Sequence, residues 1–224
     1  MIVCVDGTGP ANDKAYAKEM KNSFVRAIAH SAKDSPRYYG RGPDWTGVGR
    51  KLIRPQYVAE TVMSNRSRGS GRVFLTGYSR GAAIVIHAAR LLRDKGVRVD
   101  ALFLFDAVDR SIMLEASVIP KNVGVAYHAL RDPTTSSRES FGNCGLRAEG
   151  GVELKMRWFY TTHGGMGGSP LGKTAVKKGT TVINEGIGAA WYDGKTKVTP
   201  RQEAAGMQKV REWMWMHLRA HKVL

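Results

Sequence analysis

The sequence is poor in cysteine, in acidic residues and in long apolar runs. Its 224 residues include only two cysteines, Cys4 and Cys144, and no C-x-x-C pair. A disulfide framework, a zinc ribbon and a thioredoxin-type site are therefore not expected. No stretch approaches the roughly 18 apolar residues of a transmembrane helix. The N-terminal MIVCVDGTG turns acidic too early for a signal peptide, so we expect a cytoplasmic protein, or one exported without such a signal.

The shortage of acidic residues leaves a strongly basic chain. Asp and Glu number 19 against 35 Lys and Arg, which gives a formal net charge of +16 at pH 7. Such a charge favours contact with phosphate, for example at an anionic membrane surface, and a solvated basic face explains it equally well. The absence of zinc-finger spacing, an RNP-type aromatic motif and a helix-turn-helix argues against a nucleic-acid partner. Neither G-x-x-x-x-G-K-[ST] nor G-x-G-x-x-G occurs, so no nucleotide cofactor is expected, and no metal site either.

Short apolar runs alternate with helical patterns along the chain. We expect strands at 2–5, 72–76, 99–105, 122–129 and 154–161, and helices at 14–30, 56–63, 82–92 and 200–224. This alternation is typical of an α/β fold in which helices cover both faces of a mostly parallel sheet. No linker divides the chain, so we expect one domain over 1–224 without a large separate lid. The segments 34–50 and 165–198 are Gly-rich and poorly periodic, which predicts long loops.

The sharpest motif is Gly77-Tyr78-Ser79-Arg80-Gly81. G-x-S-x-G alone is short, but here it lies between an apolar strand and an Ala-rich helix, as a nucleophile elbow requires. The glycines keep the flanks of the turn nearly free of side chains, and the helix N-terminus favours negative charge. The alternative is an ordinary strand-to-helix turn with a surface serine. We predict that Ser79 is a nucleophile.

A serine nucleophile needs a base, and the base needs an orienting carboxylate. In α/β-hydrolases these follow in the order Ser, Asp or Glu, His. Asp106 ends the strand after the elbow helix and is the predicted acid, with Asp109 and Asp132 as rivals. His163 follows the last strong strand and opens a Gly-rich loop, which predicts the base. His128 lies inside a strand, where a core histidine is the better interpretation.

The developing oxyanion needs backbone N–H donors. One is expected from Arg80, the residue after the nucleophile, and a second from Gly7 or Thr8 in the Gly-rich loop that follows the first strand. Asp6 in that loop is expected to bond its own turn. A further interpretation is a substrate pocket lined by aromatic residues, although packing explains them equally well; the candidates are Tyr38, Tyr39, Trp45 and Tyr78.

Five segments in order resemble the α/β-hydrolase family that includes the type VI secretion lipase effectors, a phospholipase-like group. They are Val5-Asp6-Gly7-Thr8, Gly77 through Ala82, Phe105-Asp106-Ala107-Val108, Tyr127 through Leu130 with Asp132, and Trp158-Phe159 through His163 to Gly168. The chain departs from the family pattern where Gly165 replaces an aspartate and Phe105 a tryptophan.

The resemblance implies ester hydrolysis with Ser79, Asp106 and His163 in the three catalytic roles, with no cofactor, and His128 as a family feature other than the base. A small soluble ester and a phospholipid are both compatible with it. A thioesterase, peptidase or acyltransferase on the same triad is the first alternative. A basic nucleic-acid-binding protein without catalysis is the second.

Overall fold

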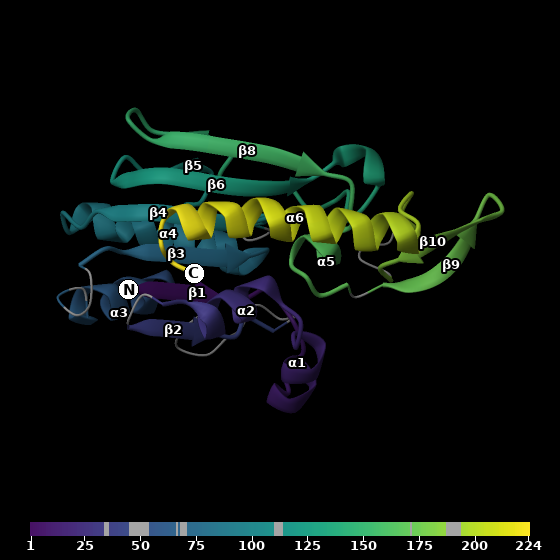
Figure 1. Ribbon diagram of the computed structural model, residues 1–224, viewed down its shortest axis with the longest axis horizontal. Coiled ribbons are helices and arrows are strands. Elements are labelled where there is room, and N and C mark those ends of the chain that lie inside the picture. The colour runs from purple at the N-terminus through teal and green to yellow at the C-terminus, as the bar shows by residue number, and fades with distance from the viewer. Residues whose placement is uncertain are drawn as a thin grey trace.

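A six-stranded sheet forms the centre of the protein in the computed structural model (Figure 1). The structure describes residues 1–33, 36–44, 54–65, 67, 71–109, 114–170, 172–186 and 194–224. The strand order is β2-β1-β3-β4-β6-β8, and every pairing within this sheet is parallel. The strands are β1 (Ile2–Val5), β2 (Arg37–Gly40), β3 (Phe74–Tyr78), β4 (Val99–Phe105), β6 (Val123–Arg131) and β8 (Glu153–Phe159).

Helices cover both faces of this sheet, and each face has its own hydrophobic core. The helices are α1 (Asp13–Glu19), α2 (Phe24–Ser31), α3 (Pro55–Asn65), α4 (Arg80–Asp94), α5 (His163–Met166) and α6 (Pro200–Ala220). Apolar residues of α3 and α4 pack on one face, and those of α2 and α6 pack on the other. The central strands β1, β3 and β4 are buried almost throughout, which explains their continuous apolar runs. The predicted α/β class, with a parallel sheet and helices on both faces, is confirmed.

Two small sheets complete the described structure. The strands β5 (Val118–Ile119) and β7 (Arg147–Ala148) pair in parallel, and β9 (Lys173–Lys177) and β10 (Thr180–Asn184) form an antiparallel hairpin that projects beyond the carboxyl end of the main sheet (Figure 1). A 3-10 turn, Pro133–Thr135, follows β6. None of the described helices has both the length and the apolar character needed to cross a membrane.

Several elements differ from the sequence predictions. The helix expected over 14–30 is two helices, because Ser23 ends the intervening turn and caps α2 by accepting from the Arg26 N–H. The segment 34–50 contains β2, and 165–198 contains the β9–β10 hairpin, so neither is wholly a loop. Both strands β2 and β9 are short and partly exposed, which weakens the hydrophobic period from which strands are predicted.

Candidate active site

Ser79 lies at a sharp turn between β3 and α4. Its backbone has φ 55° and ψ −125°, a sparsely populated conformation for a residue with a side chain. The turn is held in place because the Ser79 N–H donates to the Phe105 carbonyl at 2.9 Å. A Cβ at Gly81 would lie 2.3 Å from the Asp6 carbonyl oxygen, and one at Gly77 would lie 2.6 Å from the Ala82 nitrogen. Only glycine fits at these two positions, as the motif predicts.

The structure brings Ser79, His163 and Asp106 into one hydrogen-bonded chain. The Ser79 Oγ lies 2.9 Å from His163 Nε2, and His163 Nδ1 lies 2.6 Å from Asp106 Oδ2. A carboxylate only accepts, so Nδ1 carries the ring proton and Nε2 is left to accept from the serine hydroxyl. All three side chains are buried, at 7%, 5% and 0% exposed. The serine is therefore aimed at a basic nitrogen in an environment that largely excludes water.

The position of His163 is fixed through its backbone as well as its ring. The Tyr78 hydroxyl donates to the His163 carbonyl at 2.9 Å, and the His163 N–H donates to Ser137 Oγ at 2.7 Å. Residues Thr161 and Thr162, which precede it, donate three hydrogen bonds of 2.6–2.9 Å to the buried carboxylate of Glu203 on α6. A segment from the far end of the chain thus holds the loop that carries the imidazole.

Two of the rival candidates, His128 and Asp132, have structural contacts of their own. His128 is fully buried on β6: its Nε2 accepts from the Ala107 N–H at 3.1 Å, and its Nδ1–H donates to the Gly145 carbonyl at 3.2 Å. Burial lowers the pKa of His128 to about 4, so the ring is a neutral bridge between backbone groups, as expected of a core histidine. Asp132 caps the turn after β6 by accepting from Thr134.

The loop after β1 lies beside the elbow. A Cβ at Gly7 would be 3.4 Å from the Ser79 Cβ, which places this loop against the serine. The Gly7 N–H donates to Asp6 Oδ1 at 2.9 Å, so it is already engaged, and Asp6 bonds its own turn as predicted. None of the hydrogen bonds found among the described residues uses the Thr8 N–H, which leaves Thr8 as the candidate of the two. Arg80 is the first residue of α4, where helix N–H groups lack partners within the helix.

The structure shows packing or hydrogen-bonding contacts for three of the four aromatic residues predicted to line a pocket. Tyr78 is only 2% exposed and its hydroxyl donates to the His163 carbonyl, so it holds the His163 backbone and has almost no surface open to a ligand. Tyr39 donates to Asp6 Oδ2 at 2.9 Å and braces the loop after β1. Tyr38 packs against the core under α3 and α4. Sequence position alone could not separate these packing roles from substrate contact. Trp45 lies outside the described residues.

Several residues at the site were not predicted. Arg131 and Asn143 both bond the Asp106 carboxylate, and Ser137 and Glu203 hold the His163 segment. Arg131 ends a parallel strand, and the carboxyl ends of parallel strands meet at one edge of the sheet, so this rule could have found it. No local signal marks Glu203, which comes from the first turn of α6.

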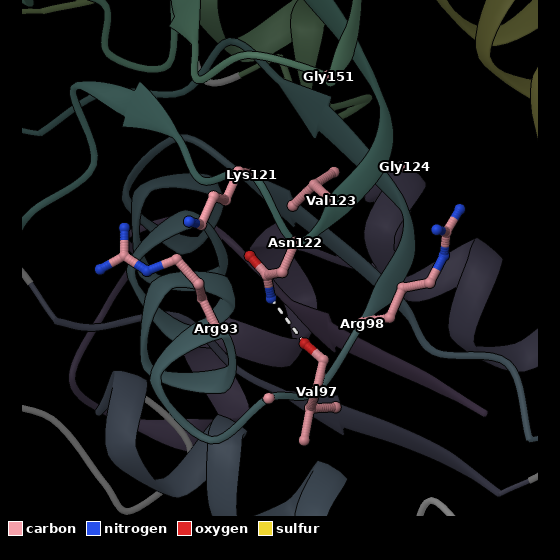
Figure 2. Close-up of a pocket in the computed structure, with 9 residues that line it drawn as sticks. Arg93, Val97, Arg98, Lys121, Asn122, Val123, Gly124 and Gly151 are labelled. Atoms are coloured by element: carbon pink, nitrogen blue, oxygen red, sulfur yellow. Dashed lines mark hydrogen bonds between the residues drawn. The ribbon is translucent and has the colours of Figure 1, made fainter.

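A separate cavity of about 490 Å³ lies at the opposite end of the sheet from Ser79, beside the amino ends of β4 and β6 (Figure 2). Val97 and Val123 line it near the starts of β4 and β6, and Arg93, Arg98 and Lys121 lie around it. It contains none of the predicted site residues. The described part of the chain holds no group of three or more His, Cys, Asp or Glu side chains placed to bind a metal ion.

Comparison with known proteins gives neither a matching family model nor a matching curated protein. Solved structures that resemble this one include a lidless α/β serine hydrolase from Xanthomonas campestris, with 12% identity over 98% of this chain and 81% of that chain at a TM-score of 0.44. The Vlm2 thioesterase domain has 14% identity over 74% and 85% at 0.41. A prodiginine-pathway thioesterase from Streptomyces coelicolor has 14% over 75% and 80% at 0.38.

These structures are described as an α/β serine hydrolase and two thioesterases, and each description concerns its own protein. At these identities and TM-scores the likeness assigns neither an activity nor a substrate to this chain. The sequence resemblance to the type VI lipase effectors stays a prediction, because no family model matches. The strand β3, the sharp turn at Ser79 and the helix α4 form the strand–turn–helix arrangement of a nucleophile elbow.

Proposed function

We propose that the protein is a serine hydrolase that cleaves carboxylic esters through an acyl-enzyme formed on Ser79. The observation that carries this proposal is the buried chain from Ser79 Oγ to His163 Nε2 and from His163 Nδ1 to Asp106 Oδ2. A hydroxyl in this setting passes its proton to the imidazole as it attacks, and the carboxylate stabilises the imidazolium that forms.

The reaction runs in two halves. Ser79 Oγ attacks the ester carbonyl while His163 Nε2 takes the hydroxyl proton, and the tetrahedral intermediate collapses as His163 returns that proton to the leaving alcohol. The acyl group is then bonded to Ser79. Water attacks the acyl-enzyme with His163 again as base, the acid is released, and the serine recovers its proton.

The negative charge that develops on the carbonyl oxygen needs donors placed in advance. The proposed donors are the Arg80 N–H at the start of α4 and the Thr8 N–H in the loop beside Ser79. The helix dipole adds a favourable positive potential at this end. Removing one such donor in other enzymes costs about 10²–10³ in kcat. Because both donors belong to backbone, the oxyanion hole is set by the elbow and by the close approach of the loop after β1.

The direct test compares Ser79→Ala with the wild type on a short-chain p-nitrophenyl ester. Loss of the nucleophile is expected to reduce kcat by about a thousandfold or more. Ser64→Ala, at an exposed serine on α3, is the matched control and is expected to keep wild-type turnover. A fluorophosphonate should label the wild type and the control on one serine, and should not label Ser79→Ala. Wild-type turnover by Ser79→Ala would remove the proposed nucleophile.

A panel of p-nitrophenyl esters, a thioester and an anilide, each at equal acyl length, then decides the substrate class. The proposal predicts that the oxygen ester has the highest kcat/KM. A higher value for the thioester or the anilide would assign a thioesterase or an amidase on the same triad. Salt-sensitive binding of DNA or RNA without fluorophosphonate labelling would instead favour a nucleic-acid-binding protein.

A further inference from the structure

The carboxylate of Asp106 carries an arginine directly on it. Arg131, the last residue of β6, places Nη1 2.6 Å from Asp106 Oδ2, and its backbone N–H lies 3.3 Å from Oδ1. The two side chains are 7% and 0% exposed. Asn143 Nδ2 donates to Oδ1 at 2.7 Å. With His163 the carboxylate thus accepts four hydrogen bonds, and only one of these partners is a permanent cation.

This arrangement offsets the free-energy cost of burying the charged carboxylate of Asp106. Burial alone raises the pKa of Asp106, because a charged carboxylate loses its hydration. A protonated Asp106 would lose the charge that orients and stabilises the imidazole of His163. The guanidinium of Arg131 and the bond to His163 outweigh burial, so that the pKa of Asp106 lies below its ordinary value.

Arg131 also joins the acid to the segment that touches the base. Its Nε donates to the Ser137 carbonyl at 3.0 Å, and its Nη2 donates to the carbonyls of Arg138 and Phe141. Ser137 accepts from the His163 N–H, and the Phe141 ring meets the imidazole edge-on at 5.5 Å between centroids. One guanidinium therefore fixes both the carboxylate and the loop packed against the imidazole.

We propose that Arg131 is a positioning residue of the triad, whose charge keeps the buried Asp106 ionised and whose fork of donors holds the loop at 137–141 against His163. The proposal rests on the proposed function, because it gives Asp106 the role of triad acid. It predicts two separate effects: the charge at residue 131 sets the ionisation of Asp106, and the donor geometry of its side chain sets the position of the loop at 137–141.

The remaining titratable groups near Asp106 do not supply this charge. Burial lowers the pKa of His128 to about 4 and raises that of Cys144 to about 12, and it also raises the pKa of Tyr78, so all three are neutral near pH 7. Arg138 forms an ion pair with Glu185, which also accepts from the Ser137 hydroxyl. Near the His163 loop, Glu203 accepts from two threonines.

The kinetic test compares Arg131→Gln, which removes the charge, with Arg131→Lys, which keeps it without the fork. For Arg131→Gln the acid limb of the kcat/KM profile is expected to move to higher pH by about one to three units. Arg131→Lys is expected to keep the wild-type limb while losing rate at its optimum. Arg93→Gln removes an ion pair with Glu149 at the far end of α4 and is expected to leave the limb in place. The proposal is overturned if the acid limb of the kcat/KM profile stays at the wild-type pH in folded Arg131→Gln, or if it shifts equally in Arg131→Lys.

A second measurement needs no catalysis and remains usable if Arg131→Gln folds poorly. With Arg131 present, the lowered pKa of Asp106 stabilises the fold above about pH 4, and this contribution is lost at lower pH. Without Arg131 the carboxylate must lose its charge to stay buried, so the destabilisation by Arg131→Gln should grow as pH rises above about 4. Asp106→Asn in the same chain should remove that growth and raise the stability at pH 7.

The stability of the double variant decides between outcomes. If Arg131→Gln with Asp106→Asn is no more stable at pH 7 than Arg131→Gln alone, the charge of Asp106 is not what Arg131 compensates, and the proposal fails. The stability measurements can give the expected result while the wild type neither cleaves an ester nor reacts with a fluorophosphonate. In that case the proposed function fails, and the role of Arg131 in keeping the buried Asp106 charged stands.

Discussion

His128 should make the stability of this protein depend on pH in a way that one substitution removes. The side chain is fully buried and bridges the Ala107 N–H and the Gly145 carbonyl, so its folded form is neutral. Its pKa is about 4 in the fold against 6.5 for an ordinary histidine. Below pH 6.5 the unfolded chain binds a proton that the folded chain does not, so stability falls with pH down to about 4.

The size of this effect follows from the shift in the pKa. Each unit is worth about 1.4 kcal/mol, so His128 accounts for a loss of about 3 kcal/mol of unfolding free energy between pH 6.5 and pH 4. A domain of this kind has only about 5–15 kcal/mol in total. In His128→Gln the amide can still accept from the Ala107 N–H and donate to the Gly145 carbonyl, but it does not titrate. This variant should lose most of that pH dependence.

Urea unfolding at intervals between pH 4 and pH 7 measures the effect, with each variant compared with the wild type at the same pH. Carboxyl groups also titrate in this range, and the comparison of variant with wild type at each pH subtracts their contribution to the unfolding free energy. His30→Gln, at an exposed position on α2, is the control and should follow the wild-type curve. An unchanged pH dependence in His128→Gln would show that the ring is not a neutral buried bridge. Loss of activity as complete as in a His163 variant, with stability retained, would assign His128 to the chemistry instead.

Two further substitutions test how the imidazole is held. Tyr78→Phe removes the donor to the His163 carbonyl and should lower the unfolding free energy by about 1–3 kcal/mol, read from urea unfolding, with a smaller loss of kcat than removal of the triad; an unchanged stability would contradict the bond. Gly165→Ala would place a Cβ 2.2 Å from Thr161 Oγ1 and 2.8 Å from Glu203 Oε1, so it should cost about 1–3 kcal/mol and reduce kcat. Wild-type turnover and melting temperature in this variant would show that the loop has room.

The structure explains why residue 165 is a glycine where the family that the sequence resembles has an aspartate. Where the family has an aspartate two residues after its histidine, this chain has a glycine against which Thr161 and the Glu203 carboxylate pack closely. Glu203 Oε1, which lies beside that glycine, accepts from the Thr162 hydroxyl, and Oε2 accepts from the Thr161 hydroxyl and the Thr162 N–H. A larger residue at 165 and the present position of Glu203 exclude each other, so the loop is stabilised by a carboxylate from α6.

Much of the site was predictable because local sequence determines local backbone geometry. The glycines at 77 and 81 are required by close backbone contacts within one turn, and the apolar strands leave Ser79 and Asp106 at neighbouring strand ends. The order of Ser79, Asp106 and His163 along the chain then limited the candidates to a few. The short, partly exposed strands β2, β9 and β10 gave no comparable pattern, and the break between α1 and α2 depends on the cap at Ser23.

By itself the sequence determined the parallel sheet, the elbow and the three residues that meet there, since each follows from steric limits and periodicity within a short segment. Only the tertiary structure decided which charges and donors surround them: Arg131 on Asp106, Glu203 beneath the His163 loop, and the Gly7 N–H engaged by Asp6. Two of these partners are separated by 25 and 41 residues from the groups they bind. A buried charge must find its partner wherever the packed chain brings one, and no local pattern records that choice.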